Sequence, residues 1–328
     1  MTPRLEAETP LRWQGLAFSA VALVIACAAR GLERIPPQAE LATMALLILL
    51  LGVPHGALDP ILARRVYRVR TALGWLSFTL VYCALAGLVI FVWQVLPLCF
   101  LAVFLLVSIG HFSGDPVQGT SKLARVMYGG AIVVLPALLH ASQVTHLFSG
   151  LASVGAANRV VPILQKLSWP WVVGLGIAAV DSARRDWQTG LELAAVALLA
   201  VLAPPLVAFT IFFCGMHSAR HILRTIDSSK TSSPRLLFAA LVAPMAGTFI
   251  LAALAWQQLR GLPLDARLIQ LVFVGLAALT LPHMAVVELS RRRLGSASRR
   301  RPLLSSRAGG SFPHSSLKQV DRMKRTSA

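Results

Sequence analysis

Long apolar stretches alternate along the chain with short clusters of charged residues, prolines and glycines. A helix needs roughly 20 apolar residues to cross the hydrocarbon layer of a membrane, and stretches of about this kind recur from end to end. Membrane-spanning helices are predicted at residues 13–29, 41–62, 72–93, 96–111, 126–147, 168–180, 187–203, 204–223, 235–259 and 264–288. The pattern therefore predicts an all-α fold, a polytopic integral membrane helical bundle of about ten transmembrane helices, within a range of about eight to ten.

The positive residues predict how these spans are oriented, because Lys and Arg concentrate in the cytoplasmic loops of membrane proteins. They gather at the N-terminus, in every second loop and above all at the end of the chain, where residues 289–328 hold 11 of the 31. The loops in between carry few. We therefore expect a multi-pass protein of the cell's inner (plasma) membrane with both termini in the cytoplasm.

The composition excludes a soluble globular protein and an obvious nucleic-acid partner. Hydrophobic residues make up 56% of the chain and charged residues only 13%, about half the usual share. Much of the net charge of +18 lies at the C-terminal end, where the arginine clusters lack the interleaved aromatic residues that base stacking needs. We predict a membrane helical domain at 1–290 and a basic, disordered cytoplasmic tail at 291–328 that rests against the lipid bilayer.

Histidine is the most informative residue type inside the predicted spans, since ionisable groups within a membrane are costly and mark functional sites. Six of the eight histidines fall within spans: His55, His111, His140, His217, His221 and His283. Counted from the outer end of each helix, all of these except His140 lie roughly 20–28 Å deep at 1.5 Å per residue. Several helices therefore bring imidazoles to one level in the inner half of the membrane.

The most specific local spacing is the pair His217 and His221 in CGMHSARH. Residues at i and i+4 lie one turn apart on one helix face, which allows two imidazoles to bind one metal ion. The glutamate of an HExxH protease motif is absent, so a zincin-type protease is disfavoured.

Three further motifs place an acid shortly after a histidine near the inner face. Asp59 follows His55 by four residues in PHGALD, Asp115 follows His111 by four in GHFSGD, and Glu288 follows His283 by five in PHMAVVE. A carboxylate near a metal-bound imidazole orients it. Together these motifs predict a metal site, although imidazoles suit iron, zinc and copper alike. A haem-binding membrane protein and an intramembrane metal or proton transporter remain alternatives.

Five motifs occur in an order that resembles the Brp/Blh family of membrane β-carotene 15,15′-dioxygenases. They are PHGALD at 54–59, GHFSGD at 110–115, PALLH at 136–140, CGMHSARH at 214–221 and PHMAVVE at 282–288. The resemblance covers about residues 41–290. This chain has Ala219 where the family pattern leads us to expect proline, and Pro60 where a histidine is often found, so no role is carried over to position 60.

The resemblance implies a catalytic domain at 1–290 that uses non-haem Fe(II) and O₂ to cleave β-carotene at its central double bond into two molecules of all-trans-retinal. By motif, the iron ligands would be His55, His111, His217 and His221. His283, Asp59 and Glu288 would be an additional ligand or residues that support the ligands, and His140 would line the substrate tunnel. The product implies a functional link to a retinal-binding opsin.

Overall fold

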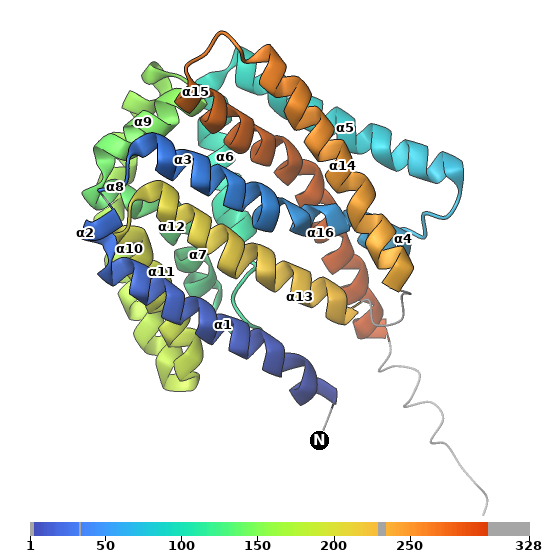
Figure 1. Ribbon diagram of the computed structural model, residues 1–328. Coiled ribbons are helices and arrows are strands. Elements are labelled where there is room, and N and C mark those ends of the chain that lie inside the picture. The colour runs from blue at the N-terminus through green and yellow to red at the C-terminus, as the bar shows by residue number, and fades with distance from the viewer. Residues whose placement is uncertain (1–2, 33, 229–233, 301–328) are drawn as a thin grey trace, which may run out of the picture. The chain divides into compact units, whose positions relative to one another are not determined.

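The computed structural model describes residues 3–32, 34–228 and 234–300. Within these ranges every regular element is helical (Figure 1). The elements are α1 (Pro3–Cys27), α2 (Ala29–Leu32), α3 (Pro37–Leu47), η1 (Ile48–Gly52), η2 (Val53–Leu58), α4 (Asp59–Val66), α5 (Ala72–Val95), α6 (Pro97–Phe112), α7 (Lys122–Val134), α8 (Pro136–Leu139), α9 (Ala141–Leu151), α10 (Val154–Arg185), α11 (Trp187–Leu202), α12 (Pro205–Ile211), η3 (Phe212–Ser218), α13 (Ala219–Ser228), α14 (Pro234–Gln258), α15 (Leu264–Ile269), η4 (Gln270–Val274) and α16 (Gly275–Arg300).

Eight stretches of the described chain are long and apolar enough to cross a membrane. They are Thr9–Cys27, Pro37–Arg64, Ala72–Val95, Lys122–Leu139, Val154–Arg185, Pro205–Asp227, Leu241–Gln258 and Leu264–Glu288. The helices α6 and α11 are apolar but shorter. Each of the predicted spans overlaps one of these helices, and the prediction of a polytopic helical membrane protein is confirmed.

The span predicted at 168–180 is much shorter than the helix that contains it, α10. Helix α10 begins at Val154, where the Ser153 hydroxyl accepts a hydrogen bond from the Ala156 amide, and it continues for 32 residues. Arg159 and Lys166 made its first half look like a loop, but both are exposed while the residues between them that face the bundle are buried. An amphipathic first half therefore extends the apolar second half into one long helix.

The single span predicted at 126–147 is instead broken into three helices. Pro136, which cannot donate a hydrogen bond to the preceding turn, begins the short α8. This helix ends at Leu139, because the backbone of the next residue, His140, is not helical. After this break the chain continues as the amphipathic helix α9. A proline inside an apolar run has here ended one helix and started the next.

The helices that carry the histidine motifs depart from α geometry at those motifs. The helix that starts as α3 widens into a π turn at η1 and then tightens into a 3₁₀ turn at η2, which contains Pro54. The residues Phe212–Ser218 form a second π turn, η3, between α12 and α13. Such turns are frequent at functional sites, because they redirect side chains without ending the helix.

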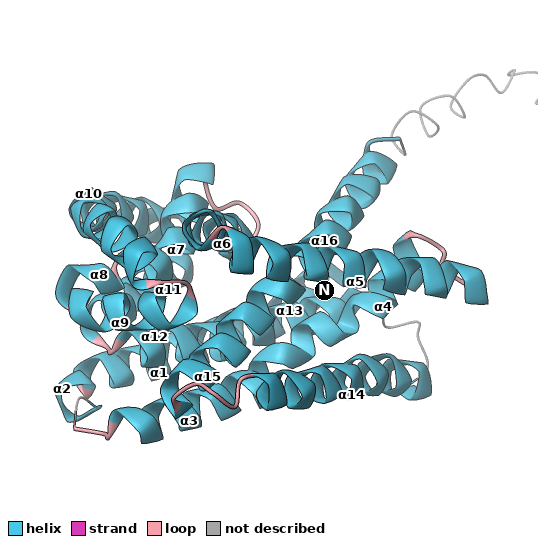
Figure 2. Ribbon diagram, turned by 90° about the horizontal axis from the view of Figure 1, so that it is seen from above, coloured by secondary structure: helices cyan, strands magenta, loops and turns pink. Residues whose placement is uncertain are grey.

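Two clusters of buried apolar side chains hold the bundle together. Helix α11 packs against α1, α7 and α10. Figure 2 shows α7, α8, α10 and α11 gathered on one side of the bundle, with α4, α5 and α14 on the other. The chain divides near Val287 into Met1–Val287 and Glu288–Ala328, and the site described below lies in the first unit. Helix α16 extends to Arg300, past the predicted domain end at 290, and the rest of the predicted tail, 301–328, lies outside the described residues.

Candidate metal centre

Five imidazoles from five different elements of the bundle face one another. They are His55 on η2, His111 on α6, His217 on η3, His221 on α13 and His283 on α16. The ring centroids of contacting pairs are 4.5 to 5.6 Å apart. The structure thus brings together the five histidines that the sequence placed at one depth.

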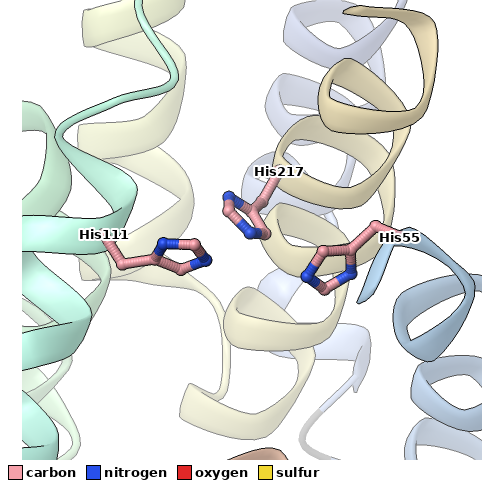
Figure 3. A group of neighbouring side chains, drawn as sticks. All are labelled: His55, His111 and His217. Carbon is pink, nitrogen blue, oxygen red and sulfur yellow. The ribbon is translucent and has the colours of Figure 1, made fainter. Parts of the chain in front are cut away.

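Three of these rings form the tightest group. One ring nitrogen from each of His55, His111 and His217 lies within 4.8 Å of the other two, and Figure 3 shows the three side chains pointing toward a common centre. His283 closes a further side of the cluster, 5.1 Å from His55 and 4.9 Å from His221 between ring centroids. A single ion at the centre would be within reach of imidazoles from several directions.

Local backbone geometry aims two of these side chains. The Nδ1–H of His55 donates to the carbonyl oxygen of Gly52, one turn earlier in the distorted helix. Gly52 is packed so closely against Phe213 that a Cβ there would lie 2.8 Å from the ring carbon Cδ1. The Ser218 hydroxyl, next to His217, donates to the Leu51 carbonyl at 2.7 Å. These contacts bind η1 to η3, and the hydrogen bond from His55 to Gly52 ties the His55 ring to η1, so the spacing between the two histidines is fixed.

Two buried carboxylates hold the outer nitrogens of two rings. The Nδ1 of His217 lies 3.0 Å from both carboxylate oxygens of Asp115, and the Nδ1 of His283 lies 2.7 Å from Asp59. With the proton on Nδ1 and donated to the acid, each ring turns its Nε2 lone pair inward. Metal-bound histidines in proteins commonly have this arrangement.

The inward nitrogens provide a test of whether the residues fit a metal. The Nε2 atoms of His217 and His283 are buried and have no hydrogen-bond partner among the described residues. A buried polar atom without a partner is unusual in a folded protein and calls for an explanation such as an absent ion. A neutral imidazole nitrogen is a good ligand for first-row divalent metals. The donor set therefore fits a metal ion.

The carboxylates do not pair with the histidines of their own motifs. Asp59 was expected to orient His55 but instead accepts from His283. Glu288 was expected beside His283 but is exposed. The acid that accepts from His283 is Asp59. Asp115, which follows His111 in GHFSGD, instead accepts from His217 and was not among the predicted site residues. Spacing on one helix suggested local pairs, whereas the fold makes long-range ones.

A buried ion pair contacts the backbone of Asp115. The guanidinium of Arg220 is fully buried and donates to both carboxylate oxygens of Glu192, at 2.8 and 2.9 Å. It also donates to the Gln14 side chain at 2.8 Å and to the Asp115 carbonyl at 3.3 Å. Arg224 donates to the same carbonyl at 2.6 Å. This pair could have been predicted from the sequence, because Glu192 and Arg220 are oppositely charged residues inside two predicted spans.

A large cavity adjoins the imidazole cluster. Its volume is about 1390 Å³, larger than the ~300–1,000 Å³ of ordinary small-molecule pockets. His55, His111 and His283 contribute to its wall. Most of the remaining wall is apolar or aromatic, with Phe104, Phe209, Phe213, Trp75 and Phe78 among the contributors. The cluster therefore faces a large and mostly apolar cavity, whose wall also includes Arg64, Arg68 and Arg70.

His140 lies apart from this arrangement. It is buried at the break between α8 and α9, and its Nε2 has no hydrogen-bond partner among the described residues. The described residues that line the cavity do not include it. The structure thus places the expected tunnel residue at a helix break instead of in this cavity wall.

The fold and the site together define a polytopic membrane protein with a buried polyhistidine centre beside an apolar cavity. The family model described as β-carotene 15,15′-dioxygenase matches residues 46–290. The chain belongs to this family.

Two relatives extend the comparison. The chain is 31% identical over 262 residues to a β-carotene 15,15′-dioxygenase of an uncultured marine bacterium, 66A03, which covers 74% of this chain and 90% of the relative. It is 25% identical over 326 residues to a probable β-carotene 15,15′-dioxygenase, Blh, of Halobacterium salinarum, covering 86% of this chain and 93% of the relative. No solved structure shows a significant match.

Proposed function

We propose that this chain is an iron-dependent β-carotene 15,15′-dioxygenase that uses O₂ to cleave the central double bond and gives two molecules of all-trans-retinal. The observation that carries the proposal is the cluster of five imidazoles, three of which (His55, His111 and His283) line a large and mostly apolar cavity. Family membership supports the choice of substrate. In the balanced reaction each oxygen atom of O₂ becomes the carbonyl oxygen of one aldehyde, so no further reductant is required.

Four histidines are proposed as the ligands of Fe(II): His55, His111, His217 and His221. His283 is proposed as a fifth ligand or as a support of the centre, since its ring contacts those of His55, His111 and His221. When bound, ferrous iron supplies the site for reaction with O₂ that amino-acid side chains lack. The absence of a thiolate from the cluster suits iron, although imidazoles alone also accept zinc and copper.

The chain's own residues orient the ligands and the substrate. Asp115 and Asp59 hold the Nδ1 protons of His217 and His283, which keeps both rings in one tautomer and one orientation. The aromatic wall of the cavity positions a polyene by apolar contact, and its apolar surface keeps water from the reacting carbons. Central cleavage requires the substrate to lie with its midpoint at the cluster, and the size of the cavity is compatible with a molecule that extends past it on both sides.

The test is expression of the chain in a host that accumulates β-carotene, with extraction of pigments and detection of retinal. Loss of the yellow colour with appearance of retinal supports the enzyme, and an unchanged pigment content at normal protein levels contradicts it. The purified, detergent-solubilised protein should contain about one iron per chain. Stoichiometric zinc, with activity unaffected by iron removal, would contradict the choice of metal.

The same experiment separates the alternatives. A haem protein would show an intense Soret absorption band, and a metal or proton transporter would not consume carotene. We also propose an inner-membrane location with cytoplasmic termini, from the distribution of positive charge. Retinal released there would be available to a retinal-binding opsin in the same membrane.

A further inference from the structure

Tyr82 connects the wall of the cavity to the imidazole cluster. Its hydroxyl donates to one carboxylate oxygen of Asp59 at 3.1 Å, and the other carboxylate oxygen accepts from Nδ1 of His283 at 2.7 Å. Asp59 and His283 are almost completely buried. Tyr82, Asp59 and His283 all line the cavity. A continuous chain of hydrogen bonds thus runs from helix α5 to a ring of the cluster.

Helix α5 is the outermost wall of the cavity. The residues it contributes are Trp75, Phe78, Thr79, Tyr82, Cys83 and Ala86, which recur at helical spacing and so share one face. No residue of α5 is buried inside the protein. A single layer of helix therefore separates this part of the cavity from lipid.

Helix α14 forms a second thin wall on the same side of the bundle (Figure 2). Its contribution, from Ala243 to Leu251, also follows helical spacing, and none of the residues in its apolar stretch Leu241–Gln258 is buried. An apolar substrate dissolved in the membrane would meet α5 and α14 first. The position of α5 therefore bears on whether substrate is present in the cavity.

Few side-chain hydrogen bonds fix α5 in place. Two connect it to other elements of the described chain: Tyr82 to Asp59, and the indole Nε1–H of Trp93 to the Leu151 carbonyl at 2.8 Å. The Trp93 bond lies eleven residues further along the helix, away from the cluster. Of the two, Tyr82 alone reaches a residue that contacts an imidazole of the cluster.

On the basis of the function proposed above, we infer that Tyr82 is a positioning residue that couples occupancy of the cavity to the orientation of His283. A carotenoid packed against α5 holds Tyr82 against Asp59, and the fixed carboxylate then holds His283 toward the other rings. Binding free energies are reciprocal, so bound substrate should tighten metal binding and bound metal should tighten substrate binding by the same factor.

The coupling is measured as the ratio of two ferrous-iron dissociation constants. Purified full-length protein in detergent is titrated with Fe(II) without oxygen, so that no turnover occurs, in the absence and presence of β-carotene. In the wild type, β-carotene should lower the dissociation constant by about fivefold or more. In Tyr82→Phe, which keeps the ring but removes the hydroxyl, the ratio should approach one. Trp93→Phe, which removes the other hydrogen bond of α5, is the matched control and should keep the wild-type ratio.

Several outcomes would overturn the inference. It is wrong if the ratio is near one in the wild type, or if Tyr82→Phe keeps the wild-type ratio. It is also wrong if Trp93→Phe lowers the ratio as much as Tyr82→Phe does. If Tyr82→Phe cannot be purified, retinal formation is measured in the host as iron supply is lowered. Tyr82→Phe should then lose activity at a higher iron level than Trp93→Phe, and equal sensitivity overturns the inference. A wild type that binds no iron overturns the proposed function as well, whereas an active wild type without coupling overturns only the role of Tyr82.

Discussion

Replacing Glu192 by glutamine should strongly destabilise the protein, because it removes the charge that compensates a fully buried guanidinium. The Arg220 side chain has no exposed surface. It donates two hydrogen bonds to the carboxylate of Glu192, at 2.8 and 2.9 Å. Two further acceptors of the guanidinium, the Gln14 amide oxygen and the Asp115 carbonyl, carry no charge. Breaking a buried pair from one side costs about 3–5 kcal/mol. That is a large part of a free energy of unfolding of about 5–15 kcal/mol.

The assay is denaturant unfolding of the detergent-solubilised protein, followed by far-UV circular dichroism. The double variant Glu192→Leu with Arg220→Met removes both charges and should recover most of the lost free energy of unfolding, since a buried apolar pair is often as stable as an ionic one. It does not restore the Arg220 contact to the Asp115 carbonyl, so its iron affinity should stay below that of the wild type. Glu192→Gln within about 1 kcal/mol of the wild type would refute the reasoning.

Gly15 offers an independent way to disturb the same pair without changing its charges. A Cβ at this position would lie 2.8 Å from Nη2 of Arg220 and 2.9 Å from Cδ of Glu192, and it would overlap the Glu192 carboxylate oxygen. Gly15→Ala should therefore lower the free energy of unfolding in the same assay. The effect should largely disappear in the double variant if the smaller charge-free side chains leave room for the methyl group.

Three further results are expected. Asp115→Asn should raise the dissociation constant for ferrous iron about 10–100-fold in equilibrium dialysis, because an uncharged amide oxygen accepts the Nδ1 proton of His217 more weakly than the carboxylate does. An unchanged constant would contradict the role of Asp115. His217→Ala should abolish retinal formation and iron binding, whereas His146→Ala, an exposed histidine whose nearest acid is 3.6 Å away, should match the wild type; the opposite result would overturn the assignment. Deleting residues 296–328 should leave retinal formation per mole of protein unchanged, and its complete loss at normal membrane levels would give this segment a role.

Hydropathy was sufficient to predict the class of fold, because each apolar run that crosses a membrane must satisfy its backbone as a helix. Where charge was used to end a helix, the prediction was less accurate. Arg159 and Lys166 lie on the exposed face of α10, and a rule that ends spans at charged residues cannot distinguish such a face from a loop. Pro136 in turn broke a run that hydropathy alone read as continuous.

The histidines of the site could be selected from sequence because depth along a helix follows from residue count. Their partners could not. Helix α6 ends at Phe112, so Asp115 lies in the following turn and no longer faces the side of the helix that carries His111. Asp59 begins α4 after the tight η2 turn and is redirected in the same way. Pairing at i+4 holds only along an unbroken helix, and both motifs fall where a helix ends or changes geometry.

Charge balance gives a final reason to expect a cation at the cluster. Glu192 is neutralised by Arg220, and the Arg224 guanidinium lies on the Asp115 carbonyl at 2.6 Å. The Asp59 carboxylate, which is 1% exposed, instead accepts from the His283 ring and the Tyr82 hydroxyl, and these donors carry no positive charge when the imidazole is neutral. A buried negative charge beside neutral donors is unfavourable in a medium of low polarity. A cation among the rings that Asp59 and Asp115 orient compensates it. The acids therefore aim the ligands and also balance the charge of the ion that the ligands would hold.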